Sequence, residues 1–179
     1  MVEGRKARDL ALLDAIDRLA RTAFDGHVWR VVREARAVLQ ASRVGARWDP
    51  GTFDVLYTSL DRNGAMEEVY FHLSRQPIFP SIPFQIHRIR VTTRRVLRLD
   101  QMSLLQQLGV DVGAYGTMDY ARTQAIADAA FFLGFDSLIV PCARSTFLNL
   151  VLFADRIEIA DAEVEYSEPI DWNIWRRSR

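Results

Sequence analysis

The sequence predicts an α+β fold in a single domain. Helical and strand patterns follow one another without the regular strand–helix repeat of a doubly wound parallel sheet. The chain has 179 residues, enough for one hydrophobic core, and 49% apolar and 26% charged residues are typical of a globular protein. No repeat, low-complexity segment or linker divides residues 1–179. We therefore expect mixed central sheets flanked by helices.

The first predicted element is an amphipathic helix over about residues 6–24. Leu12, Ile16 and Leu19 recur at helical spacing, and the pair Asp25-Gly26 ends the pattern. This helix is expected to pack on the flank of the domain.

Two strands and a second helix are predicted next. The β-prone runs 27–32 and 55–58 are separated by the turn sequence Asp49-Pro50-Gly51, which predicts two strands joined by a long loop. Asn63 is predicted to cap a helix that runs up to the proline-containing segment 77–83.

The second half of the chain mixes short strands with helices. The predicted strands are 84–91, 96–99, 137–140 and 149–153, and a short helix is predicted at 103–108. The clearest helix is capped by Thr117 or Asp119, carries an alanine-rich apolar stripe and stops at Gly134. Trp172 and Trp175 are expected to dock the C-terminal tail.

The charge balance argues against polyanionic partners such as nucleic acid and anionic membranes. Twenty-three basic residues match 23 acidic ones, so no global field attracts nucleic acid or an anionic membrane. No apolar run approaches the roughly 18 residues of a spanning helix, and the N-terminus lacks a secretory signal pattern. A single cysteine, Cys142, excludes an internal disulfide. We expect a cytoplasmic protein without direct nucleic-acid or membrane binding.

Basic residues are nevertheless concentrated in one segment. Within eighteen positions, Glu34 is the sole acidic residue among five arginines, namely Arg30, Arg33, Arg36, Arg43 and Arg47. This local excess of positive charge can hold phosphate groups.

Familiar cofactor and metal patterns are absent from the sequence. It contains no glycine-rich phosphate loop, no His-Glu-x-x-His and no Cys-x-x-Cys. His27, His72, His87 and Cys142 offer no obvious ligand set, so no metal is expected. A Cys142 nucleophile assisted by one of the histidines stays open as an alternative.

Five short motifs place polar residues in apolar or aromatic settings. In chain order they are Trp29-Arg30, Gly45-Ala46-Arg47-Trp48 with Asp49-Pro50-Gly51, Val55-Leu56-Tyr57-Thr58-Ser59, Ala65-x-x-Glu68, and the segment 138–144 with 149–153. Their order and spacing resemble the RES-domain family, which is named for an arginine, a glutamate and a serine. The resemblance covers about residues 27–156. One departure is Pro141-Cys142, where the family usually has Pro-Ser; Ser145 offers a hydroxyl at a less suitable offset from Asn149.

The resemblance implies both a fold and an activity. The fold would be related to ADP-ribosyltransferases, and the activity would consume NAD as a substrate by hydrolysis, by phosphorolysis with inorganic phosphate, or by transfer of ADP-ribose to a protein. It also implies that the protein is a toxin paired with a helix-turn-helix antitoxin of the Xre type. The toxin would form a homo-oligomer or a hetero-oligomer with its antitoxin.

The resemblance also implies roles for named residues. Glu68 would stabilise the positive charge that develops on the ribose, or alternatively orient the attacking water or phosphate. Arg30 and Arg47 would clamp the pyrophosphate or an incoming phosphate. The other expected substrate-binding residues are Tyr57, which would stack or supply a hydroxyl, Cys142 at the serine position, Asn149, Trp29 and Trp48. Glu67 is the rival carboxylate, but helix geometry turns it about 100° away from Glu68.

Two further readings of the sequence stay open. A domain of this fold that has lost catalysis and serves in protein binding is compatible with Cys142 at the serine position. An unrelated α+β protein with chance motif matches is the third reading.

Overall fold

The computed structural model describes residues 7–158 and 161–179. In chain order its elements are α1 (Leu10–Asp17), β1 (Arg21–Arg33), β2 (Val55–Ser59), α2 (Arg62–Ser74), β3 (Phe84–Arg98), α3 (Met102–Gln107), α4 (Ala121–Phe132), β4 (Ser137–Pro141), β5 (Leu148–Phe153), the 3-10 helix η1 (Ala154–Arg156), β6 (Ala162–Pro169) and α5 (Trp172–Arg177). The strands form one six-stranded sheet with helices around it, which confirms the predicted α+β class.

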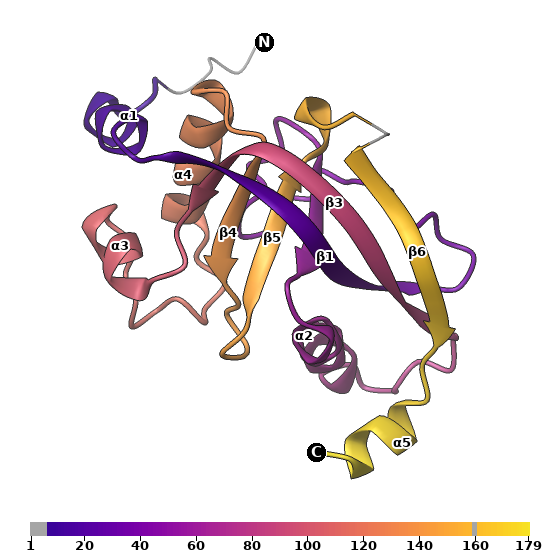
Figure 1. Cartoon of the computed structure of the whole chain (residues 1–179). Coiled ribbons are helices and arrows are strands. Elements are labelled where there is room, and N and C mark those ends of the chain that lie inside the picture. Colours follow the sequence, from indigo (N-terminus) through magenta and orange to yellow (C-terminus); the bar gives the residue numbers. More distant parts are fainter. Residues whose placement is uncertain (1–6, 159–160) are drawn as a thin grey trace, which may run out of the picture.

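The sheet closes on itself. Its strand order is β1-β2-β5-β4-β3-β6, and β1 also pairs with β3 along most of its length. Five strands therefore form a ring, and β6 extends the sheet beyond β3. Strands β3 and β4 run parallel, whereas the other described pairs are antiparallel. In Figure 1, β1 and β3 run side by side across β4 and β5.

The ring is weakest between β1 and β2. Their pairing consists of one residue pair, Trp29 with Ser59, after which the two strands separate. β2 pairs on its other side with β5 along its whole length, from Val55 to Ser59. Helix α2 follows β2 after two residues and lies against this opening.

Apolar side chains fill both sides of the strand ring. The larger cluster joins β2, β4 and β5 to α1, α3 and α4, and includes the fully buried Ile16, Phe53 and Ile126. A second cluster takes one apolar face from each ring strand, with Val28 and Ile139 among its members, and so fills the ring interior. A third packs α2 on β1 and β3.

The N-terminal helix prediction is wrong in its extent. Helix α1 ends at Asp17, and Arg21 already begins β1, whose first seven residues alternate between exposed and half-buried. Pairing of β1 with β3, from Arg21 opposite Leu97 onward, overrides the helical spacing of the sequence. Residue 6, where the predicted helix begins, lies outside the described residues.

Two strands predicted at 84–91 and 96–99 are one strand, β3. Between them, Thr92 and Thr93 pair with β1, and Asp136 accepts hydrogen bonds from the backbone of Arg94 and Arg95, which keeps this stretch extended. The strands predicted at 55–58, 137–140 and 149–153 are confirmed within one or two residues as β2, β4 and β5.

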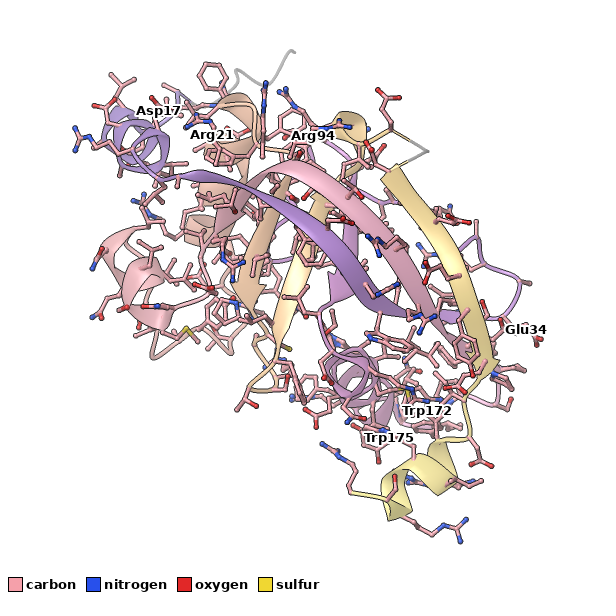
Figure 2. The ribbon with its side chains drawn as sticks, in the orientation of Figure 1. Asp17, Arg21, Glu34, Arg94, Trp172 and Trp175 are labelled. Carbon is pink, nitrogen blue, oxygen red and sulfur yellow. The ribbon has the colours of Figure 1, made fainter. Side chains whose placement is uncertain are left out.

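The tail docks through its tryptophans, as predicted. Trp175 is buried, and the rings of Trp172 and Trp175 lie 5.8 and 5.3 Å from the ring of Tyr70 on α2. Figure 2 shows both tryptophans between α5 and α2. A salt bridge of 2.7 Å between Arg179 and Glu67 adds to this contact.

Candidate functional site

A cavity of about 260 Å³ lies at the opening between β1 and β2, under helix α2. Its lining residues come from three elements: Trp29, Arg30 and Val31 from β1, Tyr57, Thr58 and Ser59 from β2, and Ala65, Glu68, Val69 and His72 from α2. Four of the predicted site residues, Trp29, Arg30, Tyr57 and Glu68, therefore meet in one place. We call it the Glu68 cavity.

Local sequence fixes α2 against this opening. The Asp61 side chain accepts hydrogen bonds from the backbone of Asn63 and Gly64, so Asp61 is the N-cap and the predicted Asn63 cap is wrong. A Cβ atom at Gly64 would lie 2.5 Å from Ser59 Oγ and 2.8 Å from Phe147 Cβ. Only glycine allows this close approach of the helix to β2, and it sets the depth at which Glu68 sits.

The Glu68 carboxylate is held from the strand side. Asn149 Nδ2 donates a hydrogen bond of 3.0 Å to Glu68 Oε2, and Cys142 Sγ lies 4.0 Å from the same oxygen. Asn149 is buried and sits opposite Ser59 of β2 and Val140 of β4 in the centre of the sheet. Sequence motifs far apart in the chain thus converge on one carboxylate.

Cys142 is buried at the end of β4, where its backbone N–H bonds the carbonyl of Phe147 across the hairpin. Burial raises the pKa of the Cys142 thiol, and the nearby negative charge of Glu68 raises it further. A protonated thiol is a weak hydrogen-bond donor and a poor nucleophile. The environment therefore favours the serine-like role over the nucleophile alternative. Ser145 accepts a hydrogen bond from Phe147 N within the same hairpin.

The Tyr57 hydroxyl is already partly engaged. It accepts a hydrogen bond of 2.8 Å from the backbone N–H of Trp48. Burial is the main reason that the pKa of Tyr57 is raised, with Asp49 and Glu68 contributing negative charge. Tyr57 therefore stays protonated and can donate a hydrogen bond.

Arg30 lines the Glu68 cavity, but two of its five N–H donors are used by its own chain. Nη1 donates to the carbonyl of Val38 and Nη2 to that of Gln40, at 2.9 and 3.1 Å. Burial and the neighbouring Arg36 lower the pKa of Arg30 to about 10, so it stays cationic near neutral pH. Arg30 thereby fixes the loop that follows β1.

Arg47 and Trp48 lie beside the Glu68 cavity instead of in it. Arg47 stacks on the rings of Tyr115 and Tyr120 at 4.7 and 4.8 Å, donates to the carbonyl of Thr117, and lines a separate cavity of about 180 Å³. Trp48 is buried in the core. The structure does not bring Arg30 and Arg47 into one cavity.

Other candidates from the sequence have structural partners. Glu67 pairs with Arg179 and Arg43 pairs with Asp54, so neither charge is free to act in the Glu68 cavity. Asp49, fully buried, accepts hydrogen bonds from the backbone of Gly45 and Gly51, which shapes the predicted turn.

Two residues near the site were not among the substrate-binding or catalytic residues predicted from the motifs. His72 lines the Glu68 cavity four residues after Glu68, a spacing that puts both on one helix face and could have identified it. Tyr115 is buried, and its hydroxyl donates a hydrogen bond to the carbonyl of Pro141, next to Cys142. No motif marks Tyr115, because its loop has no regular pattern.

A larger cavity, of about 660 Å³, lies between α1 and α4. Its charged residues already neutralise one another, since Arg8 pairs with Asp128 at 2.6 Å and Arg122 with Asp9 at 3.1 Å. The smaller Glu68 cavity offers a carboxylate without a cationic partner in the described residues, which suits chemistry on a cationic centre better.

Within residues 7–158 and 161–179, no helix has both the length and the apolar character needed to cross a bilayer. The same residues contain no cluster of three or more His, Cys, Asp or Glu side chains that could hold a metal ion.

Comparison with known proteins agrees with the arrangement of motifs. The family model of the RES domain matches residues 19–174, a longer stretch than the resemblance at about 27–156. The crystal structure of the M. tuberculosis MbcT–MbcA toxin–antitoxin complex contains a chain with a TM-score of 0.84 and 21% identity, covering 96% of this chain and 98% of that chain. At this identity the likeness shows the fold. No curated protein matches the chain.

Proposed function

Because this chain belongs to the RES-domain family, we propose that it is the toxin of a toxin–antitoxin pair and cleaves the nicotinamide–ribose bond of NAD. The observation that carries the proposal is the Glu68 carboxylate, held by Asn149 at 3.0 Å in a cavity that it shares with Trp29, Arg30 and Tyr57. The fold of this family is, in this proposal, related to that of ADP-ribosyltransferases.

The chemistry explains why a carboxylate stands here. When the bond between the ribose and nicotinamide breaks, nicotinamide leaves as a neutral group and the ribose develops positive charge at an oxocarbenium-like transition state. The ionised Glu68, in a partly dry cavity, stabilises that charge. Asn149 fixes the carboxylate from a central strand, so little reorganisation is needed during the reaction.

Neighbouring groups would orient the substrate. Tyr57 keeps its proton because burial raises its pKa, so it can donate a hydrogen bond, and its ring and that of Trp29 offer flat surfaces for the nicotinamide. The three N–H donors of Arg30 that Val38 and Gln40 leave free would bind a phosphate oxygen. Water or inorganic phosphate would then attack the ribose carbon that nicotinamide leaves.

The nearest alternative is transfer of ADP-ribose to a protein acceptor, which uses the same carboxylate. The identity of the nucleophile separates the two activities, and the Glu68 cavity is compatible with either. A purely protein-binding role is less well supported, because such a role gives no reason for a buried amide to orient a carboxylate in a cavity.

The proposed partner is an antitoxin. The structural neighbour was crystallised as a toxin–antitoxin complex, which supports a protein partner for this chain, and we propose a helix-turn-helix antitoxin of the Xre type. Binding over the Glu68 cavity would block entry of the dinucleotide. The cytoplasm, where NAD is abundant, is the proposed location.

Expression in a bacterial host tests the proposal in cells. The wild-type chain is expected to deplete NAD and arrest growth, Glu68→Gln to relieve both effects, and the matched Glu67→Gln to behave like the wild type. Normal growth with unchanged NAD, despite folded wild-type protein, would contradict the toxin function.

A further inference from the structure

Two arginines pack on the ring of Phe71, which lies on α2 one helical turn beyond Glu68. The guanidinium carbon of Arg144 lies 4.2 Å from the centroid of the Phe71 ring, and that of Arg75 lies 4.9 Å from the same centroid. Within the ranges 7–158 and 161–179, neither arginine forms a salt bridge. We call Phe71, Arg75 and Arg144 the Phe71 cluster.

Helix geometry connects this cluster to the carboxylate. Phe71 and Arg75 follow Glu68 by three and seven residues, so all three lie on one face of the helix, and His72 adds a fourth position on that face. With a rise of 1.5 Å per residue, the cluster begins about 4.5 Å and ends about 10 Å beyond Glu68 along the axis.

The hairpin between β4 and β5 approaches the same place from the sheet. Arg144 follows Cys142 by two residues, and its backbone N–H bonds Cys142 Sγ at 3.4 Å. One Nη atom of Arg144 donates to the carbonyl of Gly116, which holds the guanidinium over the ring. Stacking on an aromatic face leaves the edges of a guanidinium free for hydrogen bonding.

Two like charges beside one ring repel each other unless an anion lies between or near them. The arginines first predicted to clamp phosphate use part of their donors on backbone carbonyls, Arg30 on Val38 and Gln40, and Arg47 on Thr117. Arg75 and Arg144 therefore add positive charge for a ligand beyond the donors that Arg30 keeps free.

We propose that Arg75 and Arg144, stacked on Phe71, form an anion subsite that binds a phosphate group of the reactants beside the Glu68 cavity. This inference rests on the proposed function, which supplies two sources of phosphate oxygens: the diphosphate of the dinucleotide and free inorganic phosphate. In NAD one ribose separates the diphosphate from the bond that breaks, which agrees with a subsite about two helical turns from the carboxylate.

Variants of both arginines test the subsite. Arg75→Gln and Arg144→Gln are each expected to raise the KM for NAD or the KM for phosphate about tenfold, because each removes a charge-assisted hydrogen bond to the anion. The value of kcat should change less than about threefold. Arg144→Lys keeps the charge but loses the planar donor geometry and should give an intermediate KM. The control is Arg18→Gln, which removes one exposed arginine after α1, away from α2 (Figure 1).

Two titrations identify the phosphate source. KM for NAD at saturating phosphate rises if the subsite holds the diphosphate, whereas KM for phosphate at saturating NAD rises if it holds the attacking anion. Calorimetric binding of ADP-ribose and of inorganic phosphate to the same variants gives a readout without turnover. An inactive wild type would defeat the proposed function but leave this binding test intact. Unchanged KM values and unchanged binding in folded Arg75→Gln and Arg144→Gln would overturn the subsite.

Discussion

The Glu68 cavity and the Phe71 cluster lie on one face of the same helix but hold their charges in opposite ways. Glu68 is fixed by a buried amide from a central strand, whereas Arg75 and Arg144 rest on an aromatic ring near solvent. The first arrangement suits a charge that must not move during bond cleavage. The second suits capture and release of an anion.

This difference predicts how substitutions will separate kinetic constants. Changes around Glu68 should lower kcat, because they remove stabilisation made in the transition state, while changes in the Phe71 cluster should raise KM.

Glu68→Gln should reduce kcat for nicotinamide release by at least about a hundredfold, because it removes the negative charge opposite the ribose. Glu67→Gln is the matched control: the side chain is adjacent, but it pairs with Arg179 on the tail side of α2. Steady-state kinetics of the two variants would speak against the assignment if Glu67→Gln lost as much activity as Glu68→Gln.

Asn149→Ala should lower kcat by about ten- to a hundredfold with a small change in KM, since a hydrogen bond to an ionised group contributes about 1.5–3 kcal/mol. Asn149 is a positioning residue here, acting through Glu68. The split between kcat and KM distinguishes this role from simple loss of stability, because folded Asn149→Ala should keep the wild-type KM for NAD while kcat falls. Folded Asn149→Ala that keeps the wild-type kcat would argue for a purely structural role.

Stability should fall in alkaline solution because of the groups around the cavity. Burial raises the pKa values of Cys142 and Tyr57 above their ordinary values of 9.0 and 10.0, so the unfolded chain loses these protons first. The stabilisation is thus fully present below about pH 9 and is lost as pH rises toward the folded-state values. Urea unfolding from neutral to alkaline pH checks this, and Cys142→Ser should show a shallower decline. Equal slopes for both proteins would exclude a contribution from Cys142.

Cys142→Ser should have the smallest effect, a change in kcat within about threefold. A hydroxyl is a stronger hydrogen-bond donor than the thiol, whose sulfur lies 4.0 Å from Glu68 Oε2, so we expect a modest increase. Parallel assays of Cys142→Ser and Cys142→Ala measure it. If the alanine variant matched the serine variant, the donor role of this position would have to be abandoned.

Much of the fold follows from local patterns in the sequence. The strands β2, β4 and β5 are short apolar runs bounded by turn residues, and each was predicted within one or two residues. The extent of α1 and the unity of β3 were not, because both depend on contacts between residues far apart in the chain, such as the pairing of Arg21 with Leu97, 76 positions later. No local pattern reports such pairing.

The site, like the fold, was predicted where short motifs mark it and not where contacts between distant segments decide. The order of the motifs identified Glu68, Tyr57 and Arg30 as site residues, and they do line one cavity. The sequence could not predict the hydrogen-bond partners of Arg30. These are the carbonyls of Val38 and Gln40, which belong to an irregular loop. The Phe71 cluster was equally hidden, because Arg144 reaches Phe71 through a hairpin 73 residues further along the chain.

The most direct test of the central claim is nicotinamide release from NAD by the purified wild-type protein, measured with and without inorganic phosphate. We predict release, with ADP-ribose that carries a new phosphate on its anomeric carbon as the product if phosphate is the nucleophile, and free ADP-ribose if water is. If folded protein releases no nicotinamide with or without phosphate, cleavage by water or phosphate is contradicted. If it also releases none after candidate protein acceptors are added, NAD cleavage as a whole is contradicted.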